Sequence, residues 1–205
     1  MVAVLDYDVG NLGSIINILK KIGTQVCIAN DLDSLAKADK LILPGVGSFD
    51  EGMGKLQDSG LIPLLTNRVL EDKVPILGIC LGMQLFTKMS EEGASKGLGW
   101  IDASTVRFRF DDKNQHLKIP HMGWNEVLPN KDCCLFQEMR AESRFYFVHS
   151  YHVLCNKKED EAARTVYGYE FTSVIKRNNI LGVQFHPEKS HKFGMKLLEN
   201  FIKLV

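Results

Sequence analysis

A short apolar strand that runs without a loop into a helix constrains the fold of this chain more than any other feature. Pro75–Ile79 has the pattern of the strand, Leu81–Met89 that of the helix, and Gly78-Ile79-Cys80-Leu81-Gly82 spans the junction. A turn this sharp is strained, so side chains at Gly78 and Gly82 would collide with neighbouring elements. The pattern is that of a nucleophile elbow, which lies at the carboxyl edge of a sheet, where ligands bind in this architecture.

The first half of the chain alternates strand and helix patterns around this junction. Leu12–Ile22 has apolar residues at helical spacing, and Gly23 follows it as a C-terminal glycine does. Strands that alternate with helices predict a mostly parallel central sheet flanked by helices. The other expected elements are strands at Val2–Asp6, Thr24–Ala29 and Lys40–Leu43 and a helix at Ile62–Leu70.

The second half predicts an antiparallel extension of the sheet. Arg177-Asn178-Asn179 is a plausible tight hairpin, and Ser190 can cap a closing amphipathic helix. The sequence contains no linker or internal repeat, so residues 1–205 are expected to form a single α/β domain. The expected strands are Thr105–Phe110, Trp124–Leu128, Phe145–Tyr151, Arg164–Tyr167, Phe171–Lys176 and Ile180–Phe185.

Composition argues against several functional classes. Lys plus Arg equals Asp plus Glu at 25 each, so the balance of charge gives no basic surface for nucleic acid. No segment approaches the roughly 18 apolar residues of a membrane span, and no leader pattern is present, which predicts a cytoplasmic protein. The odd count of 5 cysteines and their irregular spacing argue against a disulfide framework, and the absence of a CxxC pair argues against a zinc site. No metal or organic cofactor is expected.

Cys80 and the segment His186-Pro187-Glu188 form the candidate catalytic set. The N-terminus of the helix after the elbow stabilises a thiolate, so Cys80 is the candidate nucleophile. A nucleophile needs a base, and the base needs an orienting group. His186 follows the strand Ile180–Phe185, and Glu188 lies two residues further, on the same side if the chain is extended. A buried structural cysteine and a surface His–Glu pair are the alternatives, and the presence of both motifs together favours catalysis.

Acyl chemistry also needs N–H donors for the oxyanion. The backbone N–H of Leu81, the residue after the nucleophile, is the first candidate. The second is expected from the loop Pro44-Gly45-Val46-Gly47, with Gly47 as the donor, because glycines let the backbone approach a substrate. By itself this loop would be read as an ordinary turn at the end of a strand.

Three motifs, taken in order and spacing, resemble those of the triad-type (class I) glutamine amidotransferases. They are Pro44–Gly47, Gly78–Gln84 and Gln184–Glu188, and the resemblance covers essentially the whole chain. It implies a flavodoxin-like fold in which Cys80 attacks the side-chain amide of L-glutamine. His186 would carry the proton to the leaving ammonia, and Glu188 would orient His186. The implied contacts to bound glutamine are Gly45, Gln84, Ser150 and Tyr151.

Further segments resemble the glutaminase subunit of imidazole glycerol phosphate synthase. They are Asp6-Tyr7, Gly10-Asn11-Leu12, Pro120–Asn125 and Lys189-Ser190. That resemblance implies a heterodimer with a (β/α)₈-barrel synthase subunit, which receives ammonia and makes imidazole glycerol phosphate and AICAR in histidine biosynthesis. Trp124, Tyr146 and Lys189 would lie at the subunit interface. Trp124 has the bulk favoured in interfaces, although packing in the core is the alternative.

Other features leave the acceptor of the ammonia open. Gly13-Ser14 and the segment Ser190–Met195 look more like paralogues found with surface-polysaccharide genes, which would supply ammonia for amidino groups on sugars. A stand-alone gamma-glutamyl hydrolase and a non-catalytic scaffold are further alternatives. A cysteine α/β-hydrolase would share the elbow, but it would usually take its acid from a segment before the histidine. The histidine-pathway subunit and the surface-polysaccharide paralogue would share the same glutaminase chemistry.

Overall fold

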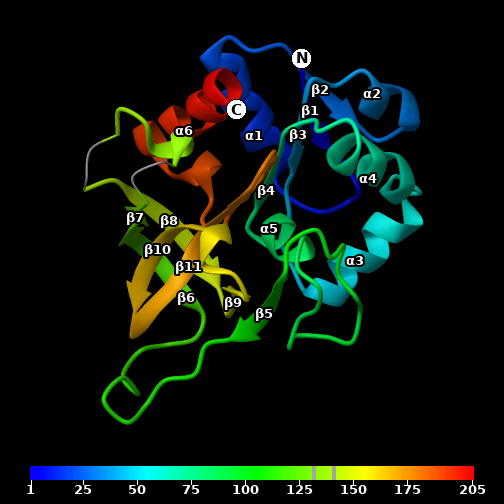
Figure 1. Cartoon of the computed structure of the whole chain (residues 1–205). Coiled ribbons are helices and arrows are strands. Elements are labelled where there is room, and N and C mark those ends of the chain that lie inside the picture. Colours follow the sequence, from blue (N-terminus) through cyan, green and yellow to red (C-terminus); the bar gives the residue numbers. More distant parts are fainter. Residues whose placement is uncertain (131–132, 140–141) are drawn as a thin grey trace.

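The parallel half of the sheet carries the elbow. The structure is a computed structural model that describes residues 1–130, 133–139 and 142–205. Five parallel strands lie in the order β2-β1-β3-β4-β12 (Figure 1). Strands β4 and β12 are direct neighbours, with Ile79 opposite Val183, so the residues that follow them meet at one edge of the sheet. The bounds are β1 Val2–Leu5, β2 Val26–Ala29, β3 Lys40–Leu43, β4 Ile76–Ile79 and β12 Ile180–Val183.

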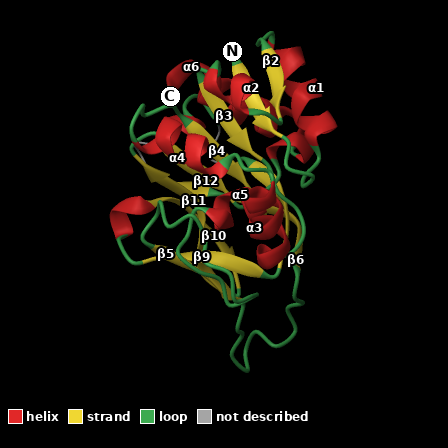
Figure 2. Ribbon diagram, turned by 90° about the vertical axis from the view of Figure 1, so that its right-hand side faces the viewer, coloured by secondary structure: helices red, strands yellow, loops and turns green. Residues whose placement is uncertain are grey.

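Helices cover both faces of this parallel half (Figure 2). Alternate residues of a strand point to opposite faces, and in β1 the residue Val4 packs with helices α1 and α6, whereas Leu5 packs with α2, α3 and α4. Both faces are apolar, as expected for a buried parallel sheet. The helices are α1 Leu12–Ile22, α2 Leu32–Ala36, α3 Phe49–Asp58, α4 Ile62–Leu70, α5 Leu81–Leu85 and α6 His191–Leu204.

The antiparallel half continues the sheet beyond β12. Strand β11 pairs with β12, β10 and β9, while β6 and β8 form a separate two-stranded sheet against it. This arrangement confirms the predicted α/β class with an antiparallel extension. The bounds are β5 Ala103–Arg107, β6 His121–Glu126, β7 Leu128–Pro129, β8 Arg144–His149, β9 Tyr151–Cys155, β10 Glu161–Tyr167 and β11 Tyr169–Arg177, with 3-10 turns η1 Cys134–Phe136, η2 Lys158–Asp160 and η3 Pro187–Lys189.

Several boundaries differ from those that the sequence predicts. Helices α2 and α3 were not predicted, and the strand expected over Phe145–Tyr151 is two strands separated at Ser150. The helix expected over Leu81–Met89 ends at Leu85. Its last carbonyl group accepts a hydrogen bond from a later segment and not from the next helical turn: Leu98 N–H donates to Leu85 O.

Ser190 does not cap α6 with its side chain, contrary to prediction. Its hydroxyl donates to His186 O and accepts from Tyr146 N–H, so it joins the residues before α6 to β8. Over the described residues, no helix has both the length and the apolar character needed to cross a bilayer.

Candidate active site

The elbow places Cys80 in a backbone conformation that few residues adopt. Its φ of 55° and ψ of −110° lie outside the usual regions, and its N–H donates to Val183 O at 2.8 Å. The flanking glycines have no room for a side chain, as the sequence predicts. A Cβ at Gly78 would lie 2.7 Å from the Gly82 backbone, and one at Gly82 would lie 1.9 Å from Leu43 O. Tight packing on both sides therefore holds the strained turn in place.

His186 and Glu188 form a buried pair next to Cys80. His186 Nδ1 donates to Glu188 Oε1 at 2.8 Å, and the two side chains are 2% and 3% exposed. His186 itself is extended, with φ −101° and ψ 95°, as predicted, whereas Pro187–Lys189 form a 3-10 turn, and the contact between the two side chains is still made. His186 Nε2 is buried and has no hydrogen-bond partner among the described residues, which leaves it available to the nucleophile or the substrate.

The groups around His186 favour the charged form of its imidazole. Burial alone would lower the pKa of His186, but the nearby Cys80 sulfur and Glu188 carboxylate outweigh burial and raise that pKa well above its usual value. An imidazolium beside a sulfur atom stabilises the thiolate form, which is the reactive one.

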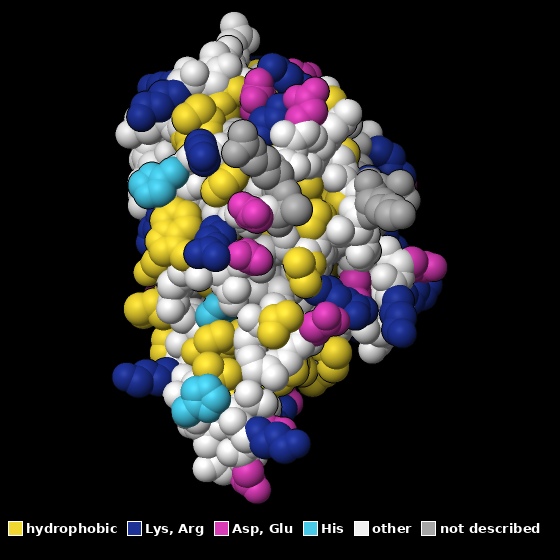
Figure 3. Space-filling model, turned by 90° about the vertical axis from the view of Figure 1, so that its left-hand side faces the viewer, with side chains coloured by type: hydrophobic (Ala, Val, Ile, Leu, Met, Phe, Trp, Pro, Cys, Tyr) yellow, Lys and Arg dark blue, Asp and Glu magenta, His cyan; other side chains and the backbone are white. Residues whose placement is uncertain are grey.

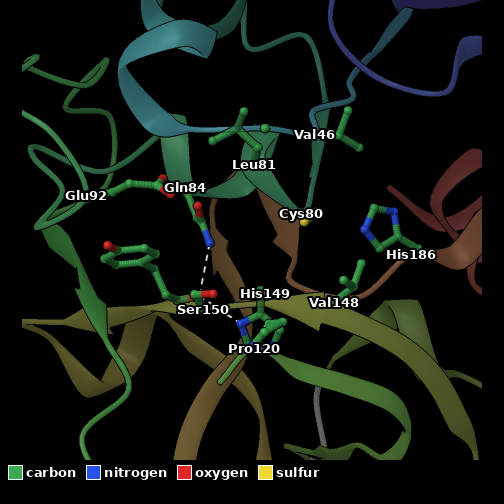
Figure 4. A pocket seen from close by; sticks show the side chains of 12 residues that line it. Val46, Cys80, Leu81, Gln84, Glu92, Pro120, Val148, His149, Ser150 and His186 are labelled. Atoms are coloured by element: carbon green, nitrogen blue, oxygen red, sulfur yellow. Dashed lines mark hydrogen bonds between the residues drawn. The ribbon is translucent and has the colours of Figure 1, made fainter. Parts of the chain in front are cut away.

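A cavity of about 320 Å³ opens over Cys80 and His186 (Figure 4). Figure 4 shows His186 on one side of Cys80 and Gln84 and Glu92 on the other, so a small amino acid lying across the cavity would meet both. Of the predicted site residues, the cavity brings together Gly47, Cys80, Leu81, Gln84, Ser150, Tyr151 and His186. Gly45 does not line it: a Cβ there would lie 2.7 Å from Leu81 Cβ, so this glycine packs under the start of α5.

The loop Pro44–Gly47 is fixed at one end and free at the other. The hydroxyl of Tyr7, which is buried, donates to Pro44 O at 2.5 Å. Gly47 lines the cavity with a φ of +99°, a conformation that favours glycine, and a Cβ there would have as its one near neighbour the flexible end of Glu51 at 3.5 Å. The space beside the Gly47 Cα is therefore open on this side.

A chain of hydrogen bonds connects the cavity wall with the sulfur. Gln84 Nε2 donates to Tyr151 O at 3.1 Å and to Gln184 Oε1 at 3.0 Å, and Gln184 Nε2 donates to Cys80 Sγ at 3.7 Å. His149 Nδ1 also donates to Tyr151 O, at 2.7 Å, and accepts at Nε2 from His121 Nδ1 at 3.0 Å. Both histidines are neutral in this arrangement, because burial lowers the pKa of His149 and lowers that of His121 to about 4.

Glu92 and Gln184 are two polar residues of the site to which the sequence assigned no role. Glu92 lines the cavity and accepts the Phe49 N–H, at the start of α3, at 2.8 Å through Oε2. It lies in a loop after α5, and nothing in the sequence Glu91-Glu92 indicates a site. Gln184 is fully buried under Cys80. It belongs to the motif Gln184–Glu188, which was the available signal, but the sequence reasoning gave it no role.

The three residues predicted at a partner interface lie together on the surface. Trp124 is 45% exposed, so it is not a core residue, and its ring stacks on His191 with the centroids 5.2 Å apart. Its ring also meets Tyr146 edge-on at 6.2 Å, and Lys189 Nζ lies 5.7 Å from the Tyr146 ring centre. Over the described ranges, no group of three or more His, Cys, Asp or Glu side chains is placed to hold a metal.

Comparison with known proteins identifies the family of this chain. The family model for class-I glutamine amidotransferases matches residues 3–204. The chain therefore belongs to the class-I glutamine amidotransferase family. Solved structures agree in fold: PurLQS from Thermotoga maritima has a TM-score of 0.73 at 17% identity, over 98% of this chain and 96% of that one.

Curated relatives point to one branch of this family. Imidazole glycerol phosphate synthase subunit HisH 2 of Methanococcus maripaludis is 56% identical over 99% of both chains. The subunit HisH 2 of Pseudomonas aeruginosa is 48% identical over the full length of both chains. The chain is thus similar, from end to end, to enzymes of the HisH group.

Proposed function

We propose that this chain hydrolyses L-glutamine to glutamate and ammonia through Cys80, His186 and Glu188. The observation that carries the proposal is the buried His186–Glu188 pair beside Cys80 at the floor of one cavity. An activated nucleophile, a base and an orienting carboxylate are what covalent acyl transfer requires. The cavity is small and lies at the carboxyl edge of the parallel strands, where ligands bind in this architecture.

The reaction follows from the positions of these groups. The Cys80 thiolate attacks the side-chain carbonyl carbon of glutamine. The resulting oxyanion accepts hydrogen bonds from the backbone N–H groups of Leu81 and Gly47. The protonated His186 gives its proton to the amide nitrogen, the C–N bond breaks and ammonia leaves. Water then loses a proton to His186 and attacks the glutamyl thioester, the C–S bond breaks, and glutamate and the thiolate are released. Glu188 holds the His186 tautomer throughout.

The far end of the cavity suits the amino-acid part of glutamine. Glu92 presents a carboxylate to the α-ammonium group, and the backbone at Ser150 and Tyr151 presents peptide groups to the substrate. Gln84 has both N–H groups committed to Tyr151 and Gln184, so its Oε1 is the atom left for the substrate.

We propose that the ammonia passes to a (β/α)₈-barrel synthase subunit in a heterodimer, as part of imidazole glycerol phosphate synthase. Relatives named as subunits of that synthase are 43–56% identical over nearly the whole chain, which favours histidine biosynthesis over sugar amidination. Trp124, Tyr146 and Lys189 mark the docking face. Figure 3 shows the side of the molecule on which α6 and the β6–β8 region lie in Figure 1, and on it hydrophobic side chains are interspersed with basic and acidic ones.

The proposal is tested by glutamine turnover of the wild type and of Cys80→Ala, each alone and with the barrel synthase and its ligand. The wild type should be slow alone and fast in the complex if the Val46–Gly47 peptide of the isolated chain points its carbonyl at the substrate, because loss of one oxyanion donor costs ~10²–10³ in rate. Cys80→Ala should abolish turnover, and Cys27→Ala, far from the cavity, should leave it unchanged. Turnover that survives Cys80→Ala refutes the mechanism, and full turnover without a partner refutes the coupling.

A further inference from the structure

Gln184 lies directly under the nucleophile without a role in the mechanism above. It follows β12, whose neighbour β4 ends at Cys80, and the pairing of Val183 with Ile79 brings Gln184 and Cys80 side by side. Its side chain is fully buried, with Nε2 donating to Cys80 Sγ at 3.7 Å and Oε1 accepting from Gln84 at 3.0 Å. The sheet therefore brings an amide to the reacting atom.

The orientation of this amide is fixed by its neighbours. Gln84 Nε2 has two N–H groups, and both face acceptors, namely Tyr151 O and Gln184 Oε1. Gln184 therefore has its oxygen toward Gln84 and its nitrogen toward Cys80. A flip of Gln184 would set its NH₂ against that of Gln84 and its carbonyl oxygen against the sulfur. The arrangement ensures that the sulfur meets an N–H donor.

We propose that Gln184 is a further catalytic residue whose side-chain N–H stabilises the Cys80 thiolate while its Oε1 holds the Gln84 amide in place for glutamine. The inference rests on the proposed function, in which that thiolate is the nucleophile. A hydrogen bond to a charged group is stronger than one to a neutral group. The Gln184–Cys80 bond therefore favours the thiolate over the thiol, weakens when the thioester forms, and is restored when the thioester is hydrolysed.

A purely structural role is the competing explanation. Buried polar side chains are nearly always hydrogen-bonded, and Gln184 could serve only to fill the space between β12 and α5. That explanation predicts a loss of stability on substitution but no effect on the protonation of Cys80. The experiment must therefore read the ionisation of the sulfur itself. Titratable groups that face Cys80 or share its cavity stay unchanged in the variants: Tyr7, Glu92, His149, Tyr151, His186 and, through His186, Glu188.

The probe is alkylation of Cys80 by iodoacetamide as a function of pH. Because Cys27, Cys133, Cys134 and Cys155 are also free, labelling is quantified on the Cys80 peptide by mass spectrometry. Gln184→Met and Gln184→Leu remove donor and acceptor while keeping most of the volume. Thr165→Val is the matched control, since Thr165 is a fully buried polar residue that bonds Ser173 and does not line the cavity.

The midpoint of the alkylation curve should rise by about one pH unit or more in both Gln184 variants, as expected for loss of a hydrogen bond to a charged group. The KM for glutamine should rise as well, because Gln84 is no longer held. Thr165→Val should leave the midpoint unchanged. An unchanged midpoint in the folded Gln184 variants, or an equal shift in Thr165→Val, overturns the inference. Alkylation needs no glutamine, so this failure is distinct from turnover that survives Cys80→Ala.

Discussion

The contact between Gly82 and the end of β3 offers a sharp test of the geometry. A Cβ at Gly82 would lie 1.9 Å from Leu43 O, whereas an ordinary contact needs about 3.4 Å. In Gly82→Ala the start of α5 must therefore move about 1.5 Å away from β3. Neither side yields easily, because β3 is hydrogen-bonded between β1 and β4, and α5 begins at the strained Cys80.

This displacement acts on activity and stability together. Leu81 N–H moves with the helix, and a misplacement of about 1 Å costs roughly 10²-fold in rate. Overpacking of this kind costs about 1–3 kcal/mol, or roughly 2–12 °C in melting temperature for a chain of this size. We expect Gly82→Ala to lose at least about 10²-fold in glutamine turnover and to melt several degrees lower.

A matched substitution separates this clash from the general effect of adding a methyl group. Gly54, within α3, has nothing within 4 Å of a Cβ, so Gly54→Ala should raise the free energy of unfolding by about 0.5–1 kcal/mol and preserve turnover. The assays are glutamine turnover of the complex and thermal unfolding by circular dichroism. Wild-type turnover and melting in Gly82→Ala would refute the reasoning, as would equal losses in both variants.

Two further predictions concern the triad and the buried histidines. His186→Ala should nearly abolish glutamine turnover. The loss of turnover in Glu188→Gln should be about 10²-fold smaller than in His186→Ala, because this variant keeps the base and the nucleophile. Equal losses of turnover in the two variants would contradict this prediction. Burial lowers the pKa of His121 in the folded protein to about 4. As the pH falls below about 6.5, His121 is therefore protonated in the unfolded chain before it is protonated in the folded one, and the protein loses stability between about pH 6.5 and pH 4. In urea unfolding, His121 should make the protein about 1–2 kcal/mol less stable at pH 5 than at pH 7.5. His121→Leu should remove this difference. An equal pH dependence in that variant would show the assignment to be wrong.

Local motifs predicted the two parts of the candidate catalytic centre, the elbow and the His186–Glu188 pair, because the geometry within each part is local. The elbow needs a strand, two glycines and a helix in immediate succession, and Glu188 reaches His186 from two residues away. The parallel direction of the strands likewise follows from their alternation with helices. In each case the residues that determine the structure are close in sequence.

The parts that escaped prediction depend on distant contacts. Helix α3 contains Gly52 and Gly54, which lower helix propensity, and it forms because Phe49, Met53 and Leu56 pack into the core. Glu92 reaches the cavity because its loop folds back to the start of α3, where the carboxylate accepts the Phe49 N–H. No short pattern in the sequence encodes such a contact.

The adjacency of β4 and β12 has a consequence for how this enzyme can change over evolutionary time. The β4–β12 ladder, inside the parallel half of the sheet, sets Cys80 beside Gln184, and the base His186 follows two residues later. Trp124, Tyr146 and Lys189 belong instead to β6, β8 and the η3 turn, at the outer surface. His186 N–H donates to Tyr146 O at 2.9 Å, and because the backbone makes this contact, side chains on that outer surface can diverge while the base keeps its place.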